Sequence, residues 1–129
     1  MRFGIPLTIP GYAAEVDLLE RIAGSPAANA LGAPFVLGDP QELAALVEKA
    51  GFSSVTVTTH QGTARFPNVR VMVEADLRGW LPVMGVLPTE EQIQQILEEA
   101  EKVLRPFVDD PGDVVFDSPA HIVTGTRPA

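Results

Sequence analysis

The stretch that decides the fold is DPQELAALVEKAGFSSVTVTTH, residues 39–60, in which helical spacing gives way to strand alternation. Asp39 is a favourable N-cap, Pro40 suits the first helical position, and Glu42 completes a capping-box pattern. Apolar residues recur at helical spacing until Gly51, a residue suited to the left-handed position that ends a helix. The β-branched segment that follows alternates apolar with polar side chains. The stretch therefore predicts a helix followed by a strand.

Helical spacing predicts three further helices, over residues 12–23, 68–80 and 89–106. The first should end at Gly24-Ser25-Pro26, which we interpret as a stop signal. The second begins at Asn68, although the β-branched run that follows could form a strand; we favour the helix. The third begins with the capping box Thr89-Glu90-Glu91-Gln92.

Strands are expected at three places, namely residues 2–9 and the segments near 55–65 and 114–125. Pro6 and Pro10 restrict the first segment to a short or edge strand. About three strands and about four helices make one domain over residues 1–129. Its class is α/β, or α+β when the chain is taken alone.

Composition narrows the choice of partners. The net charge is −8, with 9 basic residues scattered along the chain against 17 acidic ones. A protein that binds nucleic acid or an anionic membrane surface needs clustered Lys and Arg, so both are poor partners for this chain. The sequence has no cysteine, no signal-peptide pattern and no apolar run near the ~18–20 residues of a membrane span. We therefore expect a cytoplasmic protein.

Common catalytic motifs are missing from the sequence. It has neither a glycine-rich phosphate loop nor a Gly-x-Ser-x-Gly nucleophile elbow. His60 and His121 fall in expected strands without a third ligand at a suitable spacing, so we expect no metal site. The acidic residues near 98–101 and 109–110 match a solvated helix face and a turn, and nothing in the sequence argues for the burial that general acid–base chemistry would need.

Aromatic side chains and one methionine are the better candidates for a binding site. Tyr12, Phe66, Trp80 and Met84 lie in or beside the helices that interrupt the expected strands. They could line an apolar pocket for a small molecule, or they could simply pack the core. Both interpretations stay open at this stage, with core packing the simpler one.

Three phrases of the sequence carry a family resemblance. They are PFVLGDP at residues 34–40, AGF at 50–52 and AHIVTGTR at 120–127. In this order and spacing, residues 34–129 resemble the C-terminal region of class I S-adenosylmethionine-dependent methyltransferases of the ubiquinone/menaquinone-biosynthesis-like group. Upstream, PGYA at residues 10–13 is similar to the segment after that family's fifth strand.

The resemblance implies a remnant of a seven-stranded, Rossmann-like sheet of strand order three-two-one-four-five-seven-six. The chain would supply strands five, seven and six and the helical cap over the substrate. The family binds S-adenosylmethionine through its N-terminal half, whose glycine-rich turn has no counterpart here, so no cofactor-binding residue carries over. Tyr12, Phe66, Trp80 and Met84 would be substrate-binding residues, and we assign no catalytic residue.

An incomplete sheet implies a partner. The open edge at residues 2–7 would make the chain a homo-oligomer, or would dock it on a separate N-terminal methyltransferase half. By itself the chain would not transfer methyl groups. The alternatives are a stand-alone module that binds an apolar small molecule and an assembly subunit without a ligand.

Overall fold

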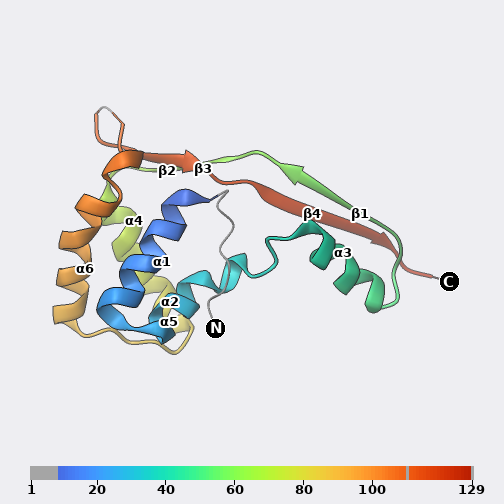
Figure 1. Cartoon of the computed structure of the whole chain (residues 1–129), viewed down its shortest axis with the longest axis horizontal. Helices are drawn as coiled ribbons and strands as arrows, with labels where there is room; N and C mark the ends of the chain where they lie inside the picture. The colour runs from blue at the N-terminus through green and yellow to red at the C-terminus, as the bar shows by residue number, and fades with distance from the viewer. Residues whose placement is uncertain (1–8, 110, 129) are drawn as a thin grey trace.

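The computed structural model describes residues 9–109 and 111–128, and shows a mixed helix-and-strand fold (Figure 1). The helices are α1 (Pro10–Ala23), α2 (Ser25–Gly32), α3 (Pro40–Lys49), α4 (Val69–Ala75), α5 (Leu81–Val83) and α6 (Glu90–Val103). Short 3-10 turns, η1 (Ala33–Phe35) and η3 (Arg105–Phe107), follow α2 and α6, and a π-helical segment, η2 (Asp76–Trp80), joins α4 to α5.

The strands form two antiparallel pairs. β1 (Ser53–His60) pairs with β4 (Ala120–Thr126), and β2 (Thr63–Phe66) pairs with β3 (Val114–Asp117). The segments near 55–65 and 114–125 are thus extended as predicted, but each is broken in two. At the break the Ser118 backbone N–H donates to Gly62 O at 2.9 Å, and Pro119 cannot donate a ladder hydrogen bond.

The fold class is confirmed only as α+β. We predicted three strands in one remnant sheet, whereas the described residues form four strands in two small sheets. Apart from Ile9, the strand expected at residues 2–9 lies outside the described part of the chain.

The molecule has two regions (Figure 1). We call α1, α2, α4, α5 and α6, together with β2 and β3, the helical body. We call α3, β1 and β4 the arm, which extends to one side of the helical body. In the helical body α1 packs on α2 and α6, and α4 packs on α6. In the arm, α3 packs on β1 and β4.

The helical body contains the hydrophobic core. Its fully buried apolar side chains come from α1, α4, η2, α5, α6 and β3 and from the residue that follows α6. They include Leu18, Leu19, Met72, Val73, Leu77, Leu81, Ile96, Leu104 and Val114. Gly11 lets α1 approach β3 closely, because a Cβ at this position would collide with the Phe116 ring. This close approach fixes the end of α1 from which Tyr12 projects.

Most predicted helix starts are confirmed. The Asn68 side chain accepts a hydrogen bond from the Val71 backbone N–H at 2.8 Å, so the helical alternative for this segment is correct. The Thr89 capping box is complete, with reciprocal bonds to Gln92 of 3.0 and 3.1 Å. Asp39 caps α3 by accepting from the Gln41 backbone N–H at 2.8 Å.

The first helix ends at Ala23 as predicted, but α2, which was not predicted, begins at Ser25. Gly24 adopts φ +90°, which ends α1, and α2 begins directly afterwards with a proline in its first turn. The same proline that we interpreted as a helix stop therefore starts a helix. As a result α2 packs against α1, and the chain reaches Phe35 beside Tyr12.

Candidate functional site

A pocket of about 270 Å³ opens between α1, the end of α2 and η2. Its lining side chains are Tyr12, Leu31, Pro34, Phe35, Asp76 and Trp80. The rings of Tyr12 and Phe35 lie 5.1 Å apart, and the Tyr12 ring also meets Phe116 edge-on at 5.3 Å. The pocket thus has aromatic walls set against the core, with one carboxyl group in its lining.

The wall formed by Trp80 is fixed by a hydrogen bond. Its indole Nε1–H donates to Ala30 O at 2.8 Å, which ties η2 to α2. The Leu81 backbone N–H donates to Asp76 O, five residues earlier, and this spacing defines η2 as π-helical. Single π-helical turns are frequent at functional sites, and here one turn supplies both Asp76 and Trp80 to the pocket.

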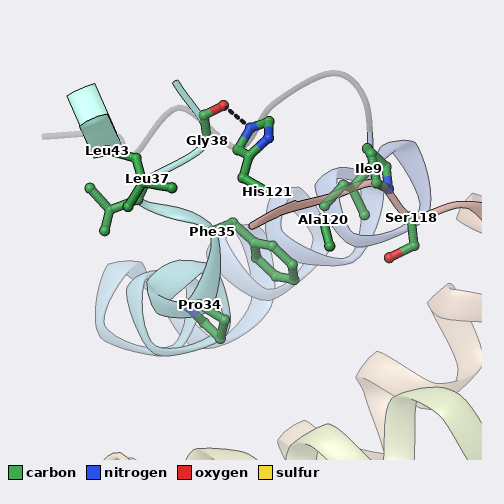
Figure 2. Close-up of a pocket in the computed structure, with 10 residues that line it drawn as sticks. Ile9, Pro34, Phe35, Leu37, Gly38, Leu43, Ser118, Ala120 and His121 are labelled. Atoms are coloured by element: carbon green, nitrogen blue, oxygen red, sulfur yellow. Dashed lines mark hydrogen bonds between the residues drawn. The ribbon is translucent and has the colours of Figure 1, made fainter. Parts of the chain in front are cut away.

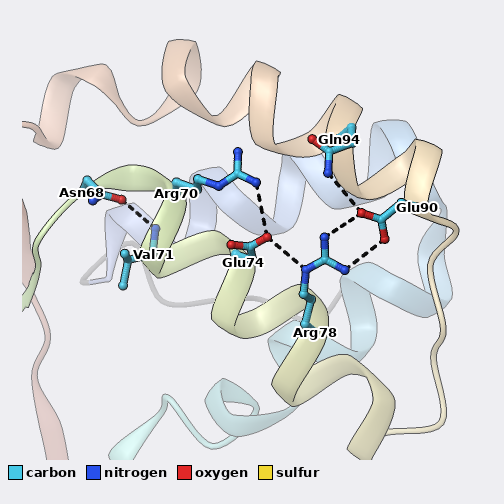
Figure 3. A network of polar contacts seen from close by, with 7 residues as sticks. All are labelled: Asn68, Arg70, Val71, Glu74, Arg78, Glu90 and Gln94. Carbon is cyan, nitrogen blue, oxygen red and sulfur yellow. Dashed lines mark hydrogen bonds and ion pairs between the residues drawn. The ribbon is translucent and has the colours of Figure 1, made fainter.

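Side-chain ion pairs hold the outer face of η2 (Figure 3). Arg78 makes two hydrogen bonds to Glu90, of 3.0 and 2.7 Å, and one to Glu74 of 3.0 Å. Glu90 opens α6, so these contacts connect η2 to α6. Arg78 and Gln94 lower the pKa of Glu90 to about 2 through hydrogen bonds. Two neighbouring elements, α2 and α6, therefore hold the segment that carries the pocket residues.

Behind the pocket lies a buried carboxyl pair. Glu15 projects from α1 and is 0% exposed, and Asp76 is mostly buried. Both carboxyl oxygens of Glu15 and Oδ2 of Asp76 lack an N–H or O–H donor among the described residues. The two carboxyls are close enough for each to affect the pKa of the other.

Burial affects the two acids to different degrees. Burial, followed by the charge of Asp76, raises the pKa of Glu15 well above its ordinary value. Burial also raises the pKa of Asp76, but the hydrogen bond from Glu15 opposes that rise. Burial and the two carboxyls raise the pKa of Tyr12 to about 12, so its hydroxyl stays protonated. Burial thus disfavours ionisation of Glu15 more strongly than that of Asp76, and repulsion between two close carboxylates disfavours ionisation of both, so Asp76 is the acid of the pair that ionises more readily.

Neither Glu15 nor Asp76 was predicted from the sequence as a site residue. A signal was present, because Glu15 lies on the same helical stripe as Leu18, Leu19 and Ile22. Asp76 similarly falls between the buried Val73 and Leu77. An acid on an apolar stripe is the pattern that could have found this pair.

Two of the four predicted substrate-binding residues, Tyr12 and Trp80, meet in this pocket. Phe66 lies elsewhere, in β2, with its ring 6.4 Å from Phe116 against the core. Met84 follows α5 and is 42% exposed. Neither Phe66 nor Met84 lines the pocket, so the structure brings together only part of the predicted set.

A second pocket, of about 400 Å³, lies where the arm meets the helical body (Figure 2). Its lining is mainly apolar, and His121 is the one titratable side chain among the described lining residues. His121 bonds to Gly38 O at 2.7 Å through Nε2 and to Thr59 Oγ1 at 2.8 Å through Nδ1. Both ring nitrogens are thus occupied, Nε2 with the loop before α3 and Nδ1 with the neighbouring strand β1. The smaller pocket, with Asp76 in its lining, is the better candidate site.

Possible metal ligands, membrane-spanning helices and related proteins were each considered for the described part of the chain. Within residues 9–109 and 111–128 no group of three or more His, Cys, Asp and Glu side chains could hold a metal ion. Among the helices in that part of the chain, none is both long and apolar enough to cross a bilayer. Comparison with models of known protein families and with curated proteins gives no match for this chain.

Proposed function

We propose that this chain is the substrate-binding part of an S-adenosylmethionine-dependent methyltransferase-like protein, with the cofactor site supplied by another segment or chain. The pocket of Tyr12, Asp76 and Trp80 would hold the methyl acceptor. The proposal combines the resemblance of residues 34–129 to the family's C-terminal region with this pocket. The observation that carries it is the pocket itself, an aromatic cavity with one ionisable group in its lining.

The arm supports the need for a partner. α3 and β1 contain no buried residue, and β4 pairs only with β1 among the described residues. The face opposite α3 exposes Thr56, Thr58, Ile122 and Thr124, and Ile122 is 50% exposed. A two-stranded ribbon by itself is marginally stable, and in the arm only α3 packs against it, on one face. A cofactor-binding half, or a second copy of this chain, would complete this sheet.

Isothermal titration calorimetry tests whether the cofactor-binding site lies outside this chain. We expect no heat of binding when S-adenosylmethionine is added to the 129-residue chain alone. Clear binding without a partner would contradict the proposal, because the cofactor site would then lie within these residues.

The pocket can be tested through ligand-induced stabilisation. A small ring compound such as benzyl alcohol should raise the melting temperature, because a ligand that binds only the folded state stabilises it. Leu31→Phe should abolish the shift by filling the pocket, since Leu31 is buried in its lining. Met84→Ala is the matched control and should keep the shift, because Met84 lies outside the pocket.

A stand-alone module that binds an apolar small molecule is the second candidate. It is favoured by one observation, namely that the pocket lies against the packed core of the helical body, where the Tyr12 ring meets Phe116. Sedimentation velocity distinguishes the two functions. A methyltransferase part should self-associate or require a partner, whereas a stand-alone module should bind its ligand as a monomer.

A further inference from the structure

The chemistry of the pocket restricts its ligand. Its described lining residues offer two oxygen-bearing side chains, Tyr12 and Asp76, and no basic side chain. The nearest basic residue along the chain, Arg78, is bound to Glu74 and Glu90 (Figure 3). The Trp80 N–H is bound to Ala30 O, so this donor is not available to a ligand. An anion would meet a carboxylate there without a compensating cation.

The buried acid behind Asp76 has no evident structural role. A fully buried carboxyl without a donor is destabilising, because burial removes its hydrogen bonds to water. Glu15 lies close to Asp76, with both of its carboxyl oxygens buried and without a donor among the described residues. Two carboxylates this close repel each other, so the site carries at most one negative charge unless a cation binds there.

From these contacts we infer that the pocket binds a small organic cation, an amine on a single-ring or similarly sized apolar body. The ammonium group donates to the Asp76 carboxylate, and the apolar body lies among Tyr12, Phe35 and Trp80. Ring faces attract cations, so the aromatic walls and the carboxylate favour the same charge. This inference rests on the proposed function and adds a substrate class to it.

The volume of the pocket agrees with a ligand of this size. At about 270 Å³ it falls just below the ~300–1,000 Å³ typical of pockets for drug-sized molecules. One ring and a short aminoalkyl chain would fill such a space, whereas a fused polycyclic body would not.

Three probes with the same phenyl body but different head groups test the charge. They are 2-phenylethylamine, 2-phenylethanol and phenylacetate, each titrated into the 129-residue chain at pH 7. Trp80 is the only tryptophan, so its fluorescence reports on this pocket alone. We expect the amine to bind about tenfold or more tightly than the alcohol, because a charge-assisted hydrogen bond is the stronger kind. Phenylacetate should bind weakest.

A charge-removing variant with a matched control locates the effect. Asp76→Asn should weaken amine binding about tenfold and change alcohol binding by less than about threefold. Asp117→Asn removes the same charge from an exposed position on β3 and should leave both affinities unchanged. Circular dichroism of each variant checks its folding, and the comparison of probes on the unchanged protein does not depend on any variant.

The outcomes separate this inference from the proposed function. Equal affinities for amine and alcohol, or an Asp76→Asn variant that keeps full amine binding, would overturn the cationic ligand and leave the pocket as a binding site. Failure of all three probes to bind would overturn the inference and also remove the main support for the proposed function.

Discussion

The helical body and the arm differ in how completely their side chains are buried. The helical body has fully buried side chains from α1, α4, α6 and β3, while α3 and β1 in the arm have none. The helical body can therefore hold a pocket of defined shape with its own residues. The arm has one packed face and one open face, so its stability depends on what covers the open face. Ligand binding and partner binding thus fall in different parts of one short chain.

The largest difference should appear when one large apolar side chain is shortened in each region. Leu18→Ala in the helical body should lower the free energy of unfolding by about 2–5 kcal/mol, because Leu18 is fully buried. Val57→Ala in the arm should cost about 1 kcal/mol or less, because Val57 is only partly buried. Urea denaturation measures both values. Equal losses would mean that the two regions are packed equally well.

A second test compares two glycines. Gly11→Ala should destabilise the chain by about 1–3 kcal/mol, since the added Cβ collides with the Phe116 ring. Gly79→Ala is the matched control, because a Cβ at Gly79 meets no atom within 4 Å. Thermal unfolding of both variants reads out the difference. A neutral Gly11→Ala would show that α1 does not pack as closely on β3 as described.

The buried acid predicts a pH dependence. The folded-state pKa of Glu15 is raised above its ordinary value of 4.5, so the folded state binds this proton more tightly than the unfolded chain. Its contribution to stability is present below pH 4.5 and is lost as the pH rises through the folded-state pKa. Glu15→Gln cannot ionise and should gain about 1 kcal/mol relative to the unchanged chain near pH 8. An unchanged difference between pH 4 and pH 8 would contradict the burial of an ionisable Glu15.

The smallest effect should come from the surface network on η2. The pKa of Glu90 is lowered to about 2, so its stabilising contribution is present above pH 4.5 and is lost as the pH falls toward 2. Glu90→Gln should abolish this acid-side loss, with little effect on stability at pH 7 because the pair is exposed. Glu91→Gln, a charge change in the same helical turn, should keep the loss. Unfolding curves between pH 2 and pH 5 separate the two variants.

Local structure was predictable where short-range chemistry dominates. The starts of α3, α4 and α6 followed from Asp39, Asn68 and Thr89, because capping depends on residues only two or three positions away. The end of α1 at Gly24 was predicted, but α2 was missed because Pro26 also suits the first turn of a new helix. The division of the long strands was not evident, since it depends on contacts between Gly62 and Ser118, 56 positions apart.

The site was only partly predictable. Tyr12 and Trp80 were identified as large aromatics next to helices, and this reasoning also selected Phe66 and Met84, which lie elsewhere. Which aromatics meet depends on how α1, α2 and η2 pack, and the π turn of η2 leaves no clear mark in the sequence. The Glu15–Asp76 pair joins residues 61 positions apart, and acids on amphipathic helices usually face solvent.

Hydrogen–deuterium exchange of the dilute, monomeric chain at pH 7, with and without 2-phenylethylamine, tests the division into two regions most directly. Without the ligand we expect slow exchange in α1 and α6 and fast exchange in β1 and β4. With the ligand we expect added protection only in α1, α2 and η2. Equal protection of β1 and α1 without a partner, or ligand-induced protection that appears in the arm instead of the helical body, would contradict it.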